Sequence, residues 1–107
     1  MQILIILSSS DPEIKWNAVR FGNVLLGEGD DVTIFLNGPA VDLAAGDSAT
    51  FPIAEQAKLF SLSEGVLAAR GKCMGIHGVD AETSLAPLSN MKFLTEQVRN
   101  ADRILNF

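Results

Sequence analysis

The residues best suited to chemistry lie in one short stretch of the chain. Cys73 is the only cysteine and His77 the only histidine, and Arg70 and Lys72 lie within three residues of the cysteine. The apolar run Val66–Ala69 just before them predicts a buried strand that ends in a turn. A cysteine at the start of a helical turn meets unpaired backbone N–H groups, and these, together with the two cations, favour its thiolate form. The stretch therefore predicts a reactive cysteine; the alternative is a small buried hydrophobic residue, the usual role of a lone free cysteine.

The histidine offers a second chemical group near the sulfur. His77 follows Cys73 by four residues, one helical turn, so its ring could contact the sulfur or help to hold the thiolate. A hydrolytic Cys–His pair also needs an acid that orients the ring and an oxyanion hole, and the sequence offers no clear candidate for either. We therefore interpret His77 as a surface residue rather than a general base. One cysteine and one histidine are too few for a zinc site, so we expect no metal and no cofactor.

A run of three serines follows the first apolar segment. Ser8, Ser9 and Ser10 precede a predicted helix, where Ser10 with Glu13 fits a capping box and Asp11 before a proline fits an N-cap. Such a helix N-terminus could hold a phosphate or a sulfur oxyanion. The run lacks the glycines of a dinucleotide or P-loop fingerprint, so it does not indicate nucleotide binding. Helix capping explains most of the motif, and an anion site remains the alternative.

The pattern of apolar residues along the chain predicts an alternation of strands and helices. Strands are expected at Gln2–Leu7, Asp31–Leu36, Val66–Ala69 and Asp102–Phe107, helices at 12–27, Pro52–Leu59 and 91–101, and helical turns at Ala40–Ala45 and Met74–His77. Asp80–Ala86 is expected to be a polar connection, followed by an N-cap within 87–90. A strand, a helix and a second strand form a βαβ unit, which requires parallel strands and a right-handed crossover. The order β-α-β-(α)-β-α-α-β thus predicts one small three-layer α/β domain over residues 1–107, built on a doubly wound parallel sheet.

The predicted helices carry apolar stripes that should face the sheet. In the first helix, Ile14, Ala18, Phe21 and Leu25 recur at helical spacing. Trp16 lies off this stripe, which predicts either a subunit contact or packing against the neighbouring crossover. The stripe of the last helix consists of Met91, Leu94, Val98 and Ala101, and that of the Pro52–Leu59 helix of Ile53, Ala57 and Phe60.

Ligands of doubly wound sheets bind at the carboxyl ends of the parallel strands. Three segments are expected there: Ser8–Asp11, Asn37–Pro39 and Gly71–Cys73. Asn37 and Gly38 thus join the serines and the cysteine as expected site residues. The connection Ala40–Phe60 is long and rich in small residues, so it is either a binding loop or lid, or a surface crossover.

The amino-acid composition of the chain limits the kinds of molecule that it is expected to bind. A net charge of −5, with eight scattered basic residues, argues against a nucleic-acid-binding surface. Charged residues make up only 20% of the chain, which indicates that part of the surface is buried against another subunit. A single cysteine excludes an internal disulfide and fits a reducing, cytoplasmic compartment. The apolar start at Ile3–Leu7 is too short for a signal peptide, and no segment reaches the length of a membrane span.

Several of these motifs, taken in order, resemble the DsrE/DsrF-like family. The resemblance is carried by Trp16–Phe21 and Asp31–Leu36 for the opening βαβ unit, Gly71–Met74 and His77–Val79 for the cysteine segment, and Ser89–Leu94 and Ala101–Phe107 for the closing helix and strand. It covers nearly the whole chain and is weakest across Ala40–Phe60.

The resemblance implies a small α/β fold, self-association as trimers or hexamers, and intracellular sulfur transfer through a cysteine that carries a persulfide. The matching cysteine here is Cys73. Many close relatives have a further cysteine where this chain has Arg70, so a relay between two thiols is not available to it. Many also have arginine where His77 stands, which weakens an anion-holding role there, especially above neutral pH.

Two functional hypotheses follow. In the first, a sulfur carrier or sulfurtransferase, Cys73 accepts sulfane sulfur from a donor protein and passes it to an acceptor. Arg70 and Lys72 would then stabilise the thiolate, while the serine loop and Asn37-Gly38 shape the pocket. In the second, the chain is a non-catalytic oligomeric module that binds a small ligand or another protein. Membership of a fold does not decide between them.

Overall fold

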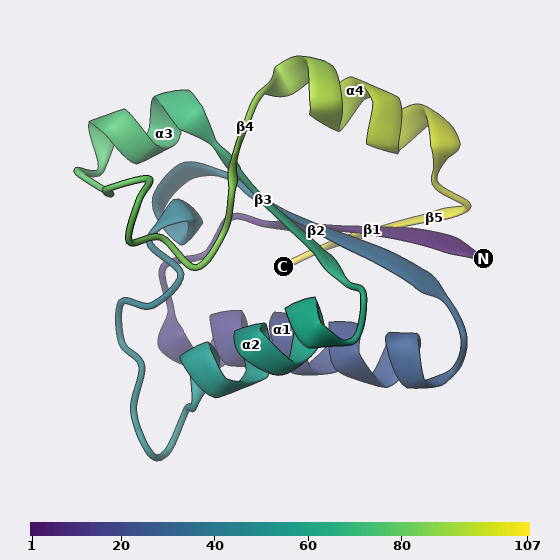
Figure 1. The fold of residues 1–107 in the computed structure, drawn as a ribbon, viewed down its shortest axis with the longest axis horizontal. Coiled ribbons are helices and arrows are strands. Elements are labelled where there is room, and N and C mark those ends of the chain that lie inside the picture. The colour runs from purple at the N-terminus through teal and green to yellow at the C-terminus, as the bar shows by residue number, and fades with distance from the viewer.

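All five strands of the sheet are parallel and follow the order β4-β3-β2-β1-β5 (Figure 1). The computed structural model describes residues 1–107, and its strands are β1 (Gln2–Leu7), β2 (Asp31–Leu36), β3 (Val66–Arg70), β4 (Leu88–Ser89) and β5 (Arg103–Asn106). The four predicted strands and the α/β class are confirmed. Strand β4 was not predicted, because two residues are too few to show a periodicity.

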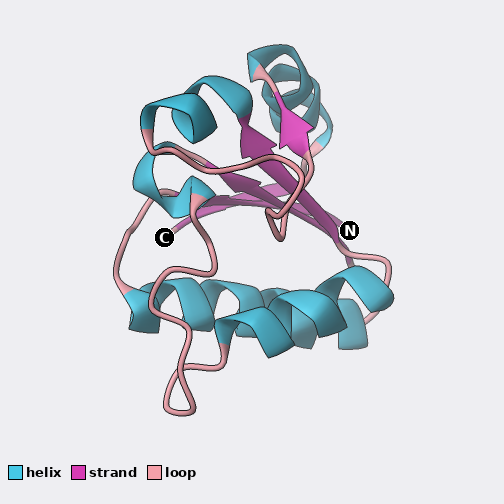
Figure 2. Ribbon diagram, turned by 60° about the vertical axis from the view of Figure 1, so that its left-hand side comes forward, coloured by secondary structure: helices cyan, strands magenta, loops and turns pink.

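Helices cover both faces of this sheet, so the domain has the three layers expected. The helices are α1 (Pro12–Gly27), α2 (Ile53–Leu62), α3 (Gly71–Ile76) and α4 (Met91–Asn100), with a 3₁₀ helix η1 (Gly38–Val41) after β2. Figures 1 and 2 show α1 and α2 side by side on one face, and α3 and α4 on the other. None of these helices has the length and apolarity needed to cross a membrane.

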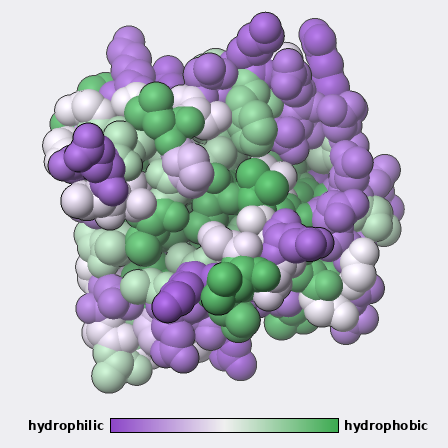
Figure 3. All heavy atoms as spheres, viewed as in Figure 1, coloured by the Kyte–Doolittle hydropathy of each residue, from purple (hydrophilic) through white to green (hydrophobic).

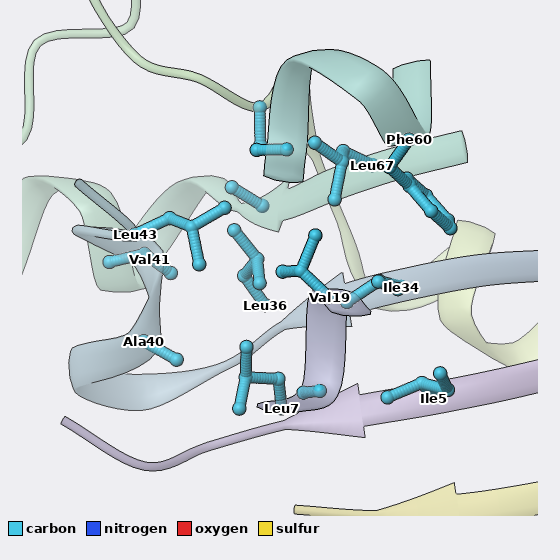
Figure 4. Packing of buried hydrophobic residues seen from close by; sticks show 14 of the residues in the cluster. Ile5, Leu7, Val19, Ile34, Leu36, Ala40, Val41, Leu43, Phe60 and Leu67 are labelled. Atoms are coloured by element: carbon cyan, nitrogen blue, oxygen red, sulfur yellow. The ribbon is translucent and has the colours of Figure 1, made fainter. Parts of the chain in front are cut away.

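The main core fills the space between the sheet and the α1–α2 layer. Its strand residues include Ile5, Leu7 and Ile34, and its helix residues include Val19 and Phe60, all fully buried (Figure 4). The opposite face of the sheet has a smaller buried cluster of Leu4, Phe35 and Ala68, against which Phe93 and Leu94 of α4 pack. Central strands with apolar residues on both faces account for the uninterrupted apolar runs in the sequence.

Helix α1 begins where the sequence predicts but turns a different face to the sheet. Asp11 is its N-cap, and Asp11 Oδ1 accepts hydrogen bonds from the backbone N–H groups of residues 13 and 14. The predicted stripe is wrong at Ile14 and Phe21, which are 40% and 41% exposed. The buried face instead consists of Lys15, Ala18, Val19 and Gly22. The helix packs closely on Phe60 of α2, since a Cβ added at Gly22 would lie 2.9 Å from Phe60 Cε1.

Lys15 is a buried polar residue that the apolar pattern does not reveal. Its side chain is only 1% exposed, and its Nζ donates hydrogen bonds to the carbonyl oxygens of Asp42 at 3.0 Å and Ala45 at 2.7 Å. Burial lowers the pKa of Lys15, and the nearby carboxylates of Asp42 and Asp11 partly oppose that shift. The lysine therefore fastens the start of the Ala40–Phe60 connection to the first turn of α1.

Trp16 packs against the same connection, as one of the two alternatives predicts. Its ring lies 5.9 Å from that of Phe51, centroid to centroid, and the Arg20 guanidinium lies over the Trp16 ring, 5.1 Å from its centroid. Both ends of the connection are thus held to α1. Helix α2 then buries Ile53, Ala57 and Phe60, the three residues of its predicted stripe.

Candidate functional site

The geometry of the site follows from the pairing of β2 with β3. Leu36 at the end of β2 lies opposite Ala69 of β3, so the next residues, Asn37 and Arg70, are neighbours at the carboxyl end of the sheet. The chain turns directly from β3 into α3, and Cys73 lies in the first turn of that helix. Two strand ends therefore bring Asn37 and Arg70 to the cysteine, although Asn37 is 36 residues away along the chain.

Two polar groups surround the sulfur. Arg70 Nη1 lies 3.7 Å from Cys73 Sγ and is placed to donate to it. Asn37 Oδ1 lies 3.9 Å from the same sulfur and accepts from the thiol S–H. A guanidinium next to the sulfur favours the thiolate, whereas an amide oxygen favours the protonated thiol. A half-turn of the Asn37 amide exchanges its oxygen for its NH₂ group, which donates to a thiolate.

The sulfur is nevertheless buried. Cys73 is 5% exposed and belongs to the main hydrophobic cluster, next to the buried Met74. The structure thus combines both interpretations of the cysteine: it is packed like a core residue and yet has a cation and an amide as neighbours. The surrounding chain therefore shields most of the cysteine from solvent.

The other predicted groups near α3 form no hydrogen bond with the sulfur. Lys72 and His77 are both exposed, and neither side chain forms a hydrogen bond or ion pair. His77 is the C-cap of α3, where its backbone N–H donates to the carbonyl oxygen of Cys73 at 2.9 Å. Arg70 is therefore the basic residue that the fold brings to the cysteine.

The serine run lies at the same end of the sheet, beyond β1. Strand β1 pairs with β2 rather than β3, so Ser8, Ser9 and Ser10 are one strand further from the cysteine than Asn37 is. Ser9 Oγ accepts a hydrogen bond from the backbone N–H of Asp11 at 3.0 Å, while Ser8 and Ser10 are exposed. The run thus helps to form the turn that starts α1, in agreement with the capping interpretation.

Gly38 has a conformational role at this rim. Its φ of +57° lies in the left-handed region, which glycine adopts without a steric penalty. This turn directs the chain from β2 into η1, which contacts α3. Gly38 therefore shapes the loop that carries Asn37 beside Cys73.

Strand β4 completes the surroundings of α3, and sequence reasoning missed it. The backbone N–H of Ala69 donates to the carbonyl oxygen of Pro87 at 2.8 Å. A Cβ added at Gly71 would lie 3.1 Å from Leu88 Cδ1, so β4 packs directly on the first residue of α3. The only local signals for this element are a proline and one leucine at the end of a polar connection.

A cavity of about 320 Å³ lies near this end of the sheet, between the crossover Val41–Ala44 and the loop Gly78–Leu85. Its lining does not include Cys73. No group of three or more His, Cys, Asp or Glu residues lies close enough together to hold a metal ion.

Comparison with known proteins shows the fold of the chain. No family model and no curated protein matches the sequence. The crystal structure of the ychN protein from E. coli is similar over the whole of both chains, with a TM-score of 0.85 and 19% identity. A conserved protein of unknown function from Bacteroides thetaiotaomicron, BT1422, is similar over 99% of this chain and 94% of its own, with a TM-score of 0.80 and 21% identity. The chain therefore shares its complete fold with these two proteins.

Proposed function

We propose that this chain is a sulfur carrier of the DsrE/DsrF-like type, in which Cys73 accepts sulfane sulfur from a persulfide and passes it to a partner thiol. The observation that carries the proposal is the placement of Arg70 Nη1 and Asn37 Oδ1 within 4 Å of Cys73 Sγ, at 3.7 and 3.9 Å. The motifs that resemble the family and the fold shared with the ychN protein support it.

The transfer exchanges one S–S bond for another. The Cys73 thiolate attacks the outer sulfur of a donor persulfide, R–S–SH, and forms a new S–S bond to it while the donor's S–S bond breaks. The donor leaves as a thiolate, which takes up the proton that Cys73 lost. A partner thiolate then attacks the terminal sulfur on Cys73 and releases the Cys73 thiolate. No oxidant or reductant is consumed in either step.

The neighbours of the sulfur have distinct roles in this scheme. The Arg70 guanidinium stabilises the attacking thiolate and the negative charge on a bound persulfide. The Asn37 side-chain oxygen accepts a hydrogen bond from the S–H group of the resting thiol. After rotation of the amide, its NH₂ group donates a hydrogen bond to the thiolate. Lys72 and His77, which are exposed on α3, and the serines at the end of β1 flank the approach of a donor protein.

A buried sulfur requires local opening before it reacts. Helix α3 has six residues and no side-chain hydrogen bond at its N-cap, and the loop after it reaches β4, a strand of two residues. Short elements with few hydrogen bonds open at low free-energy cost. We propose that movement of α3 together with the 77–87 loop exposes Cys73 to donor and acceptor proteins.

The second candidate is a non-catalytic oligomeric module that binds a small ligand or another protein. The observation in its favour is the 5% exposure of Cys73, which suits a core residue. In this case the polar neighbours of the sulfur only satisfy a buried thiol, and loss of the thiol leaves the assembly and its binding unchanged.

The rate of alkylation by iodoacetamide as a function of pH separates the two candidates. A carrier has a Cys73 that is labelled at neutral pH in the native protein through local opening, at a rate that low concentrations of urea leave unchanged. The non-catalytic module has a Cys73 whose labelling waits for global unfolding, so the rate rises with urea at every pH. Cys73→Ser gives the background in both cases.

From the family resemblance, we propose that copies of this chain associate with one another in the cytoplasm as a trimer or hexamer. Figure 3 shows apolar side chains gathered on the face that Figure 1 presents, where β3, β4 and α2 lie nearest the viewer. The exposed apolar side chains of these elements are Leu59, Leu62, Val66 and Leu88, here called the edge patch. Exposed apolar side chains gathered on one face are typical of an interface.

A further inference from the structure

The cysteine segment differs in charge from the rest of the chain. Residues 65–79 form the longest stretch without Asp or Glu, and they include Arg70, Lys72 and His77. Six of the eight Lys and Arg residues and all thirteen Asp and Glu residues lie outside this stretch. A chain with a net charge of −5 therefore has a positively charged segment around its only cysteine.

No carboxylate of this chain neutralises these basic side chains. The single ion pair of the structure joins the N-terminal ammonium to Asp30, at 3.0 Å. Asp80 and Glu82 lie on the loop after α3, where Asp80 Oδ1 accepts a hydrogen bond from the backbone N–H of Glu82 at 2.9 Å. Neither carboxylate lies within 4 Å of a basic group. The cations of the cysteine segment are therefore free to pair with carboxylates of another molecule.

Helix α3 has one buried side and one exposed side. Cys73 and Met74 are buried, whereas Lys72 is exposed. Ile76 is 69% exposed, more than every other large apolar residue except Leu62. Lys72 and Ile76 are one helical turn apart, so they lie on the same side of the helix. Figure 1 shows α3 at the periphery of the molecule, away from α1 and α2, so this side is open to a partner.

We infer that the outer surface of α3, formed by Lys72 and Ile76 and bordered by Arg70, docks an acidic segment of a second protein. This protein is the donor or the acceptor of the proposed sulfur transfer, on which the inference rests. Its carboxylates pair with Lys72 and Arg70, and one of its apolar side chains packs on Ile76. Arg70 links the docking surface to the reaction, because its partly exposed guanidinium lies 3.7 Å from Cys73 Sγ.

The extent of the positive charge favours a short acidic protein segment over a nucleic acid. A nucleic acid binds through contacts between many basic side chains and its phosphates, but here Glu64 precedes the basic stretch and Asp80 follows it. A short segment covers residues 70–77 alone and meets only positive charge there. It is therefore attracted to this surface without being repelled by the acidic remainder of the chain.

Peptide persulfides test this docking. A peptide of glutamates around one leucine, ending in a cysteine persulfide, is compared with the same peptide carrying glutamine in place of glutamate. The acidic peptide should load sulfur onto Cys73 at least about tenfold faster at low salt, and the difference should shrink as salt screens the charges. Equal loading by the two peptides would overturn the inference and leave sulfur transfer intact. No loading by either peptide or by a small persulfide would overturn the proposed function, and the inference with it.

A charge exchange separates docking from a structural effect. Lys72→Glu should slow loading by the acidic peptide at least about fivefold and should speed loading by a peptide with lysine in place of glutamate. Ile76→Ser should slow loading by the acidic peptide, but not by a version with alanine in place of leucine. The matched control is Lys58→Glu, which makes the same charge change at an exposed position of α2 and should alter none of these rates. An equal effect of Lys58→Glu would mean that net charge alone acts, which would overturn the inference.

Binding without transfer is measured on ¹⁵N-labelled Cys73→Ser, with the acidic peptide ending in serine. Saturable amide shifts are expected around residues 70–77, and shifts centred elsewhere would overturn the inference. If the same shifts arise in the free protein when its concentration is raised, a second copy occupies the surface and the inference is wrong.

Discussion

Among single residues, Arg70 is the one best placed to change the reactivity of Cys73. Its guanidinium lies 3.7 Å from the sulfur and is partly exposed, so we expect its charge to lower the barrier to alkylation by about 1 kcal/mol, roughly a fivefold effect on the rate. Arg70→Gln should therefore slow alkylation of Cys73 at neutral pH about fivefold, and Arg70→Lys should restore part of the rate.

Lys72 provides the control for this measurement, because it is even closer to Cys73 in sequence than Arg70 but is exposed and makes no hydrogen bond to the sulfur. Lys72→Gln should change the rate less than twofold. Equal slowing by both substitutions would mean that general surface charge, not the Arg70 contact, governs the thiol.

The buried Lys15 should make the free energy of unfolding depend on pH. Its pKa is lowered by burial, so in the interval between the lowered pKa and the ordinary one the unfolded chain holds a proton that the folded chain has lost. Over that alkaline interval this residue makes the free energy of unfolding rise with pH, while below the lowered pKa its contribution is constant and unfavourable.

Lys15→Met should abolish this rise, so that the wild-type protein gains stability relative to the variant as the pH increases. At neutral pH we expect the variant to be about 1 kcal/mol less stable, since the carbonyl oxygens of Asp42 and Ala45 lose a charged donor and regain only water. Urea unfolding at a series of pH values measures both effects, with the exposed Lys58→Met as control. Parallel stability curves for wild type and Lys15→Met would contradict this account.

At the scale of secondary-structure elements, the contact between α1 and α2 depends on a glycine. A Cβ at Gly22 would lie 2.9 Å from Phe60 Cε1 and 3.2 Å from Ile34 Cδ1, so Gly22→Ala should destabilise the protein by about 1–3 kcal/mol through overpacking. Gly27 ends the same helix and has no atom within 4 Å of an added Cβ. Gly27→Ala should therefore be neutral or slightly stabilising. Thermal unfolding compares the two, and equal Tm values would show that the helices can separate without cost.

The elements were predictable to different degrees, for physical reasons. The runs of β1 and β2 are buried on both faces, so composition alone reveals them. The buried face of α1 was not predictable, because it contains a lysine and a glycine, Lys15 and Gly22, in place of apolar side chains. The approach of Asn37 and Arg70 to the cysteine was predictable, because the residues that follow neighbouring parallel strands meet at the carboxyl end of the sheet. The burial of Cys73 was not predictable in the same way, because it depends on β4 and η1, which local sequence patterns do not specify.

For the whole molecule, the edge patch predicts assembly. Leu62 is 74% exposed and Leu88 62% exposed in the single chain. If copies associate through this patch, Leu62→Asp combined with Leu88→Asp should convert the assembly to a monomer of 11.4 kDa in light scattering after gel filtration. Val24→Asp, an exposed apolar position on α1, is the control and should leave the assembly intact. A monomeric wild-type protein at high micromolar concentration would rule out the assembly.

The proposed sulfur transfer is tested on the whole molecule, by the mass of the intact protein after incubation with a persulfide donor. The carrier account predicts that the wild-type chain gains the mass of one sulfur atom, that a thiol acceptor removes it, and that Cys73→Ser gains none. An unchanged wild-type mass under saturating donor, or an equal gain in Cys73→Ser, would contradict it.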